Sequence, residues 1–297
     1  MILYKYRSNS DFTDKILTDK KVWLSNAAGL NDPFECTIGE IAKDWIDNEV
    51  KKLKNGHMGG FLHAAMQSIK TNTNFYDLNP KQTKEFLKKF GQKDFEAQYK
   101  TTRDFIFRKT GKELSNPEET FKNFDNQLNQ VGIFSLSETD ENELMWAHYA
   151  DSSKGIALGF EVTDGGKLAD AEHCLKVNYS DVRPTFTGEG FKLKVEIYAA
   201  GKSIQKISFN DSTFQQAVST KTTNWSYEKE WRYIEEFSGS YDYPGKLKEI
   251  IFGLKCPNDI RQKYIELVSN YFDYPLDFYE IVILPKSNKL TKTRYDH

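Results

Sequence analysis

The stretch Trp225-Ser-Tyr-Glu-Lys-Glu-Trp-Arg232 places three aromatic residues, two carboxylates and two cations within eight positions. Its alternation is typical of a strand, which we expect from 227 to 236. Successive side chains of a strand point to opposite faces, so Glu228, Glu230 and Arg232 would share one face. Such a face is either a surface ladder or a polar site. The flanking aromatic residues favour burial, which would make the carboxylates pair with Arg232 or with ligand hydroxyls.

Runs of apolar residues predict further strands on both sides of this stretch, and crossover helices do not join them regularly. We therefore expect an α+β fold with a mixed or antiparallel central sheet. An Asp140-x-x-Glu143 pattern predicts the start of one helix. The expected strands are 2–7, 21–25, 133–137, 155–162, 175–179, 248–254 and 278–284, and the expected helices are 11–17, 141–150, 212–221 and 259–272.

Residues from about 40 to 130 differ in character from the rest of the chain. They are rich in lysine and carry apolar residues at helical spacing, which predicts about four helices. We interpret this region as a helical insertion in a single domain of residues 1–297, because the strands on either side are too few to fold alone.

Composition narrows the class of protein. A net charge of -2 over 297 residues gives no basic footprint for nucleic acid. Three widely spaced cysteines indicate neither a disulfide framework nor a zinc site. We find no signal peptide and no apolar run of membrane-spanning length, so a cytoplasmic protein without a membrane segment is expected.

The first strand alternates, with Tyr4 and Tyr6 on one face and Lys5 and Arg7 on the other. This is either an edge strand with a solvated basic face or one wall of a cleft in which Arg7 binds an anion. Further along, the segment from Ser25 to Glu35 contains Asn31-Asp-Pro, which predicts a turn that needs no ligand. Ser25 and Asn31 are candidate ligand contacts if this turn borders the cleft.

Two further clusters are candidates for a site. Ser135 and Ser137 share one face of a strand that should belong to the core, and such conflicts often mark sites, although Ser137 could simply cap a helix. In Leu144-Met-Trp-Ala-His-Tyr149, His148 is either a core residue or a ligand donor, and Trp146 is a possible wall for a flat ring. No second histidine lies at metal-ligand spacing. Lys221 would join the Trp225 segment if its helix ends at the strand.

Several of these motifs, in this order, resemble the bacterial family called domain of unknown function 2971. The resemblance spans nearly the whole chain, with about 40–130 as the variable part, and it implies no activity. The motifs are Leu3-Tyr-Lys-Tyr-Arg7, Trp23-Leu-Ser25, Asn31-Asp-Pro-Phe-Glu35, Phe134-Ser-Leu-Ser137, Met145-Trp-x-His-Tyr149, Lys154-Gly155 and Trp225-x-Tyr-Glu-x-Glu-Trp-Arg232.

A second resemblance is to the ADP-ribosyltransferase fold, whose enzymes carry a basic residue on a first strand, then a Ser-x-Ser strand, then a catalytic glutamate often in a Glu-x-Glu pair. Arg7, Ser135-Leu-Ser137 and Glu228-Lys-Glu230 follow that order. The resemblance implies that Glu230 bonds the 2′-hydroxyl of the nicotinamide ribose, that Glu228 orients an acceptor or water, and that Arg7 holds the pyrophosphate of NAD. Trp146 or Tyr149 would stack on nicotinamide.

These observations lead to one set of candidate residues and to three functional hypotheses. The first is an NAD-binding ADP-ribosyltransferase or NAD glycohydrolase, of the toxin or phage-defence type, with NAD as a possible substrate and no firmly implied cofactor. The second is a hydrolase or nuclease that binds a divalent cation through Glu228, Glu230 and Asp32. The third is a non-catalytic ligand- or protein-binding module, with the helical insertion as a possible partner surface. The candidate catalytic residues are Glu230 and Glu228, and the candidate substrate-binding residues are Arg7, Tyr4, Ser25, Asn31, Ser135, Trp146, His148, Tyr149, Lys221 and Arg232.

Overall fold

The strand that contains Glu230 lies within an eight-stranded mixed sheet, so the protein has the expected α+β class. The structure is a computed structural model that describes residues 1–39, 41–122, 124–185, 192–197 and 203–296. The chain divides into two compact units. We call Met1–Gly39, Asn126–Pro184 and Ser212–His297 the sheet unit, and Glu40–Asp125 with Thr185–Asp211 the helical unit.

The sheet has the strand order β14-β13-β12-β4-β1-β3-β10-β5. β12 and β13 pair in parallel and the other neighbours are antiparallel, which makes the sheet mixed. The bounds are β1 Ile2–Arg7, β3 Gly132–Ser137, β4 Ile156–Glu161, β5 Cys174–Lys176, β10 Glu230–Glu235, β12 Lys246–Phe252, β13 Asp277–Ile283 and β14 Leu290–Arg294.

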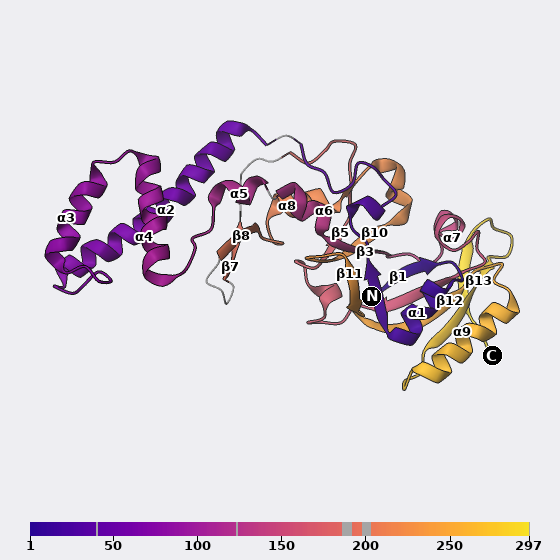
Figure 1. Cartoon of the computed structure of the whole chain (residues 1–297). Helices are drawn as coiled ribbons and strands as arrows, with labels where there is room; N and C mark the ends of the chain where they lie inside the picture. Colours follow the sequence, from indigo (N-terminus) through magenta and orange to yellow (C-terminus); the bar gives the residue numbers. More distant parts are fainter. Residues whose placement is uncertain (40, 123, 186–191, 198–202, 297) are drawn as a thin grey trace. The chain divides into compact units, whose positions relative to one another are not determined.

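Helices cover both faces of this sheet (Figure 1). On one face, α1 (Asp11–Asp19) and α9 (Asn258–Tyr271) pack over the main core, to which Leu3 of β1 belongs. On the other face, α7 (Glu143–Tyr149) packs over Tyr4 and Tyr6. The alternation expected for β1 is therefore the alternation between the two sides of the sheet.

The sheet opens between β1 and β3. β1 pairs with β4 along its whole length, but with β3 only where Tyr4 faces Ser137. Beyond that point the edge of β3 is bridged instead by Ser25, whose N–H and carbonyl bond the backbone of Ile133. Ser25 follows β2 (Lys21–Leu24), which pairs with β11 (Gly239–Asp242). The split between β1 and β3 sets the position of the pocket described below.

Short elements complete the sheet unit around this split. Three of them, α8, β9 and η3, lie in the segment that leads into β10 and so returns the chain to the edge of β3. These elements are α6 (Phe124–Gln130, mostly in this unit), η1 (Ala27–Gly29), η2 (Lys167–Ala169), β6 (Asn178–Tyr179), α8 (Ser212–Ser219), β9 (Thr220–Lys221) and the 3₁₀ helix η3 (Thr223–Glu228).

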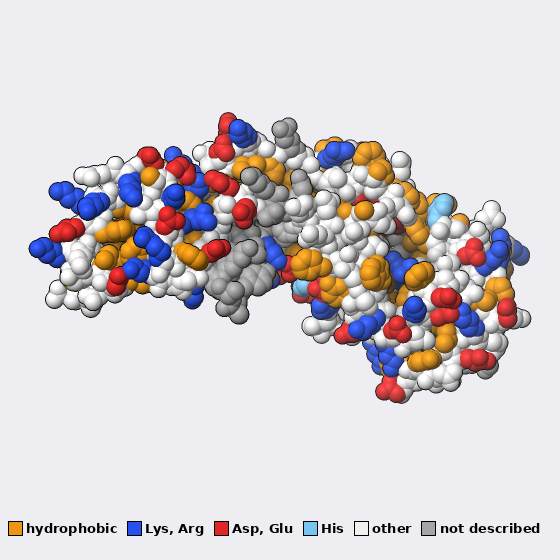
Figure 2. Space-filling model, viewed as in Figure 1, with side chains coloured by type: hydrophobic (Ala, Val, Ile, Leu, Met, Phe, Trp, Pro, Cys, Tyr) orange, Lys and Arg blue, Asp and Glu red, His pale blue; other side chains and the backbone are white. Residues whose placement is uncertain are grey.

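The helical unit has its own aromatic core, centred on Phe61 with Phe75 and Phe105 around it. Lys54 is buried and is bonded by Glu96 and Glu118. Figure 2 shows basic and acidic side chains interspersed over the visible face of α2, α3 and α4. The elements are α2 (Lys43–Lys70), α3 (Pro80–Gly91), α4 (Phe95–Thr110), α5 (Pro117–Lys122), β7 (Leu193–Ile197) and β8 (Ser203–Ile207).

The structure differs from the sequence-based expectation in several local features. The strand expected from 227 begins only at Glu230, because Lys229 adopts a left-handed conformation with φ 44° after η3. The helix expected from 141 begins at Glu143, because the side chain of Asn142, rather than Asp140, accepts the first backbone N–H groups. The strand expected at 175–179 is interrupted at Val177.

Some elements were not expected from the sequence, including β7, β8 and the polar strand β14. The helices expected between about 40 and 130 are present, but the helical unit also takes residues 185–211. The assignment of 1–297 to one domain with an insertion stays a prediction. Within the described ranges, no helix is long and apolar enough to cross a membrane.

Candidate functional site

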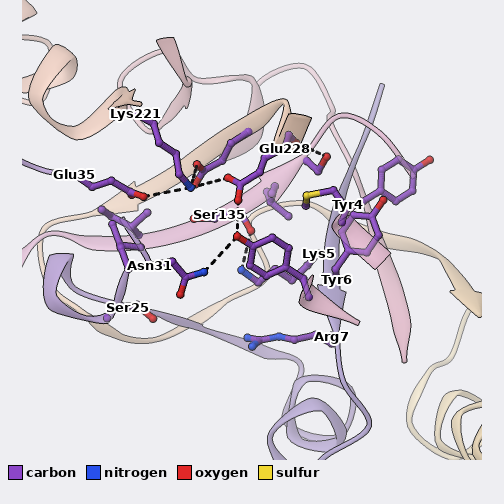
Figure 3. A pocket seen from close by; sticks show the side chains of 18 of the residues that line it. Tyr4, Lys5, Tyr6, Arg7, Ser25, Asn31, Glu35, Ser135, Lys221 and Glu228 are labelled. Carbon is purple, nitrogen blue, oxygen red and sulfur yellow. Dashed lines mark hydrogen bonds and ion pairs between the residues drawn. The ribbon is translucent and has the colours of Figure 1, made fainter. Parts of the chain in front are cut away.

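A pocket of about 220 Å³ opens where β1 and β3 separate (Figure 3). Its walls come from β1, the segment after β2, β3, α7 and the segment from β9 to β10. Most of the candidate residues from the sequence line it, whereas Trp146, His148 and Arg232 do not. The candidates that line it are Tyr4, Arg7, Ser25, Asn31, Ser135, Tyr149, Lys221, Glu228 and Glu230. Ser137, considered with Ser135, also lines it, and lining residues outside the candidate set include Lys5, Tyr6, Trp23, Glu35 and Met145.

Lys221 is the centre of a carboxylate cluster at one end of the pocket. Its Nζ lies 2.6 Å from Glu228, 3.2 Å from Glu230 and 3.2 Å from Glu35. Burial alone would lower the pKa of Lys221, but the charges of Glu230, Glu35 and Glu228 outweigh it and raise the pKa. The lysine therefore stays protonated and holds three carboxylates together.

Arg232 lies behind this cluster and is fully buried. Its Nε donates to Glu230 at 3.1 Å, its Nη2 donates to Glu35, and its Nη1 donates to the carbonyl of Val218 at 2.5 Å. Burial would raise the pKa of Glu230, but the charges of Arg232 and Lys221 hold it at about 2. Glu230 is thus ionised at neutral pH and held rigidly.

Glu228 is the last residue of η3, and its side chain enters the pocket because the next residue turns the backbone. Ser137 Oγ donates to the Glu228 carbonyl at 2.7 Å, and Asn142 Nδ2 donates to the Tyr227 carbonyl at 3.2 Å. These bonds fix the left-handed turn at Lys229, a conformation that a side chain disfavours. The Glu228 carboxylate accepts from Lys221 and from the hydroxyl of Tyr149.

Tyr149 connects the carboxylate cluster to the loop after β2. Its hydroxyl donates to Glu228 and accepts from Asn31 Nδ2 at 3.3 Å. Burial and the Glu228 carboxylate both raise the pKa of Tyr149, so its hydroxyl is neutral and available as a hydrogen-bond donor. Asn31 and Tyr149 thus meet in space although 118 residues separate them in sequence.

Two basic side chains that line the pocket, Lys5 and Arg7, have no carboxylate partner within ion-pair distance among the described residues. Lys5 Nζ donates to the Ser135 carbonyl at 2.8 Å and lies 4.8 Å from the ring centre of Phe134. Burial, and then the charge of Arg7, lower the pKa of Lys5 to about 7. Arg7 Nε is buried without a hydrogen-bond partner, and burial lowers the pKa of Arg7.

The position of Arg7 depends on a close backbone contact. A Cβ on Gly155 would lie 2.1 Å from the Arg7 carbonyl oxygen, so only glycine allows the end of β1 to approach the start of β4. Figure 3 shows Arg7 and Ser25 on the side of the pocket away from Lys221 and Glu228. The pocket therefore has a paired, carboxylate-rich end, and the unpaired Arg7 lies on the side away from it.

The remaining candidates lie outside the pocket. Trp146 is fully buried, packs edge-on against Tyr6 at 4.9 Å between ring centres, and donates Nε1 to the Asp140 carbonyl at 2.7 Å. His148 is exposed and its nearest ring is that of Tyr227, at 6.1 Å between centres. Helical spacing alone did not separate these two side chains from Tyr149, which does line the pocket.

The arrangement of carboxylates gives no support for a metal site. Asp32 accepts from Thr222 Oγ1 at 2.9 Å and does not line the pocket. Lys221 occupies the position between Glu228 and Glu230 where a cation would lie. In the described part of the chain, no group of three or more His, Cys, Asp or Glu side chains could hold a metal ion.

Comparison with known proteins gives one finding. No curated protein and no solved structure shows significant similarity to the chain. A family model described as "Protein of unknown function (DUF2971)" matches residues 145–233. The matched segment runs from α7 to β10 and includes Tyr149, Lys221 and the Glu228–Arg232 stretch. The match supports the resemblance of this chain to the DUF2971 family over residues 145–233.

Proposed function

We propose that the pocket binds NAD and cleaves its nicotinamide–ribose bond, as an ADP-ribosyltransferase or NAD glycohydrolase would. The observation that carries this proposal is the division of one pocket into two ends. Ionised carboxylates at one end suit ribose hydroxyls and a developing positive charge. The unpaired Arg7 on the opposite side, with Lys5 beside Ser135, suits a pyrophosphate. The motif order Arg7, Ser135-x-Ser137 and Glu228-x-Glu230 lies on β1, β3 and at the start of β10, which supports the same reading.

The reaction would break the bond between C1′ of the ribose and the nicotinamide nitrogen. Both bonding electrons go to nicotinamide, which leaves as a neutral molecule, and the ribose carries an oxocarbenium-like positive charge. Water or an acceptor hydroxyl then forms the new bond at C1′ and gives up one proton. A fixed carboxylate pair lowers the barrier by stabilising that charge where it develops.

The two glutamates have different capacity for new contacts. A carboxylate offers about four acceptor positions. Glu230 already accepts from Arg232, Lys221 and Ser135. Glu228 accepts from Tyr149 and Lys221 and retains free positions. We therefore propose that Glu228 takes the larger part in contacting the ligand, and that Glu230 supplies the fixed negative charge beside it.

The experiment is incubation of the purified protein with NAD in the presence of EDTA, with free nicotinamide measured over time. Wild-type protein is expected to release nicotinamide, and Glu228→Gln to reduce the rate by about 10²–10³, the loss typical of one charge-stabilising contact. Glu235→Gln is the matched control, because Glu235 lies on the same strand, bonds Lys167 and Tyr233, and does not line the pocket.

Three results would count against the proposal. Equal activity in wild type and Glu228→Gln would remove the carboxylate pair from the mechanism. Activity that disappears in EDTA and returns with magnesium would favour the metal-dependent hydrolase. No turnover at all would favour the binding module. The acceptor and a role as a toxin or phage-defence effector stay predictions.

A further inference from the structure

An exposed tryptophan borders the pocket. Trp23 lies on β2, lines the pocket, and is 60% exposed. Within the described residues, its indole has no hydrogen bond and no ring partner. An aromatic ring exposed at the mouth of a polar pocket offers a flat apolar surface on which a ligand ring could stack.

The geometry of β2 places this ring beside Ser25. Side chains two positions apart on an extended chain point the same way, so Trp23 and Ser25 lie opposite Leu24, which is fully buried in the main core. Ser25 is anchored to Ile133 by two backbone hydrogen bonds. In Figure 3, Ser25 and Arg7 lie on the side of the pocket away from Lys221.

The pocket therefore presents three kinds of surface. Lys221 with its carboxylates and Tyr149 lies on one side, and Arg7 and Ser25 lie on the other, with the exposed ring of Trp23 beside Ser25. A dinucleotide presents matching groups: the hydroxyls of one ribose, a pyrophosphate, and a second nucleoside with a flat base.

We propose that Trp23 stacks on the adenine of the bound dinucleotide, and that Lys5 joins Arg7 in holding its pyrophosphate. This deepens the proposed function and rests on it, because it assigns the direction in which the ligand lies. The scissile bond is then at Glu228, and the adenine is at the opposite end of the pocket.

Two ligands separate the two ends. ADP-ribose contains adenine and pyrophosphate, whereas nicotinamide mononucleotide contains the ribose, the nicotinamide and one phosphate but no adenine. Stacking of a base on an aromatic side chain typically gives about tenfold in affinity when tested by alanine substitution. Binding of both ligands to wild type, Trp23→Ala and Trp23→Phe is measured by calorimetry.

Trp23→Ala is expected to weaken ADP-ribose by about tenfold and nicotinamide mononucleotide by less than twofold, and Trp23→Phe to recover most of the loss. Phe12→Ala is the matched control, because Phe12 is 78% exposed, lies on α1 and does not line the pocket. It should change neither affinity. Melting temperatures of all variants should stay near that of wild type.

Other outcomes overturn the inference in distinguishable ways. If wild type releases nicotinamide from NAD but Trp23→Ala binds ADP-ribose normally, the adenine assignment is wrong while the proposed function stands. Equal weakening of both ligands would place Trp23 at the reactive end and also overturn the assignment. If wild type neither binds these ligands nor releases nicotinamide, both the function and the inference are wrong.

Discussion

Charged side chains in two parts of the pocket differ in whether they have ion-pair partners. At one end, Arg232 is fully buried and every charge around it has a partner. Elsewhere in the pocket, Arg7 and Lys5 have no carboxylate within ion-pair distance in the described residues, and Arg7 Nε has no hydrogen bond. Both parts belong to the same split between β1 and β3.

This difference distinguishes charged residues that stabilise the sheet unit from charged residues that remain able to bind a ligand. A buried charge is retained at low cost only when it is paired. The Arg232 network meets that condition in the protein alone, so it is a structural element that also orients Glu230. Lys5 and Arg7 do not meet it, and side chains that break a local rule often mark functional sites.

The largest effect is expected for Arg232→Met, which tests the structural role of the buried network. This variant would leave Glu35 and Glu230 buried with Lys221 as their remaining cation. We expect the free energy of unfolding to fall by about 3–5 kcal/mol, the usual loss when one partner of a buried pair is removed. Urea denaturation followed by circular dichroism measures it. Arg294→Met is the control: its ion pair with Asp277 is exposed, so the loss should be at most about 0.5 kcal/mol. Similar losses for both variants would contradict a structural role for the buried network.

A second test is Arg7→Met, which removes the unpaired cation that we propose for ligand binding. We expect the affinity for ADP-ribose to fall by about 10–100-fold, because a hydrogen bond to a charged group typically contributes about 1.5–3 kcal/mol. The free energy of unfolding should not fall, since Arg7 has no ion pair to lose. Calorimetry and urea denaturation of the same preparation give the two numbers. A variant that binds normally but unfolds more easily would reverse the assignment of Arg7.

The third prediction uses the pKa of Lys5, which is about 7 in the folded protein against 10.5 for an ordinary lysine. Below pH 7 both the folded and unfolded chains hold this proton. Above pH 7 the folded protein releases it while the unfolded chain keeps it, so stability contributed by Lys5 rises with pH. We expect a rise of up to about 1 kcal/mol per pH unit between pH 7 and 8.5.

Lys5→Met is the test of that slope. The free energy of unfolding is measured by urea denaturation at about pH 7, 7.75 and 8.5. It should rise with pH in wild type and change less in the variant. The same slope in both proteins would show that Lys5 is an ordinary solvated lysine whose pKa is not lowered by burial.

The smallest effect is expected for Ser137→Ala, which removes the hydrogen bond to the Glu228 carbonyl. We expect a loss of about 0.5–1.5 kcal/mol in the free energy of unfolding, the usual contribution of one neutral hydrogen bond. Because this bond fixes the left-handed turn at Lys229, nicotinamide release should fall by more than ADP-ribose affinity. A loss confined to stability would limit Ser137 to a packing role.

The sequence predicted the parts of this comparison that depend on local pattern. The alternation of Tyr4-Lys5-Tyr6-Arg7 correctly predicted which side chains share a face of β1. The pairing of Glu230 with Arg232 on burial was correctly expected, whereas Glu228 lies before the strand and pairs with Lys221 and Tyr149. The α+β class with a mixed sheet followed from strands without regular crossover helices.

The rest depends on contacts between distant residues, which local pattern does not contain. Glu35 pairs with Arg232 across 197 residues, so its role could not be read from the turn in which it lies. The left-handed Lys229 depends on bonds from β3 and α7 to the preceding backbone. Lys5 could equally have been a solvated edge residue, because only the opening of the sheet beside β3 shows where its ammonium group lies.

The most direct test of the account is titration of NAD into wild type and Glu228→Gln by calorimetry without metal, with free nicotinamide measured in the same samples. We expect saturable binding to both proteins and nicotinamide release by wild type alone. No heat and no nicotinamide with folded wild-type protein would contradict it, and the Glu228–Arg232 stretch would then be a structural charge network.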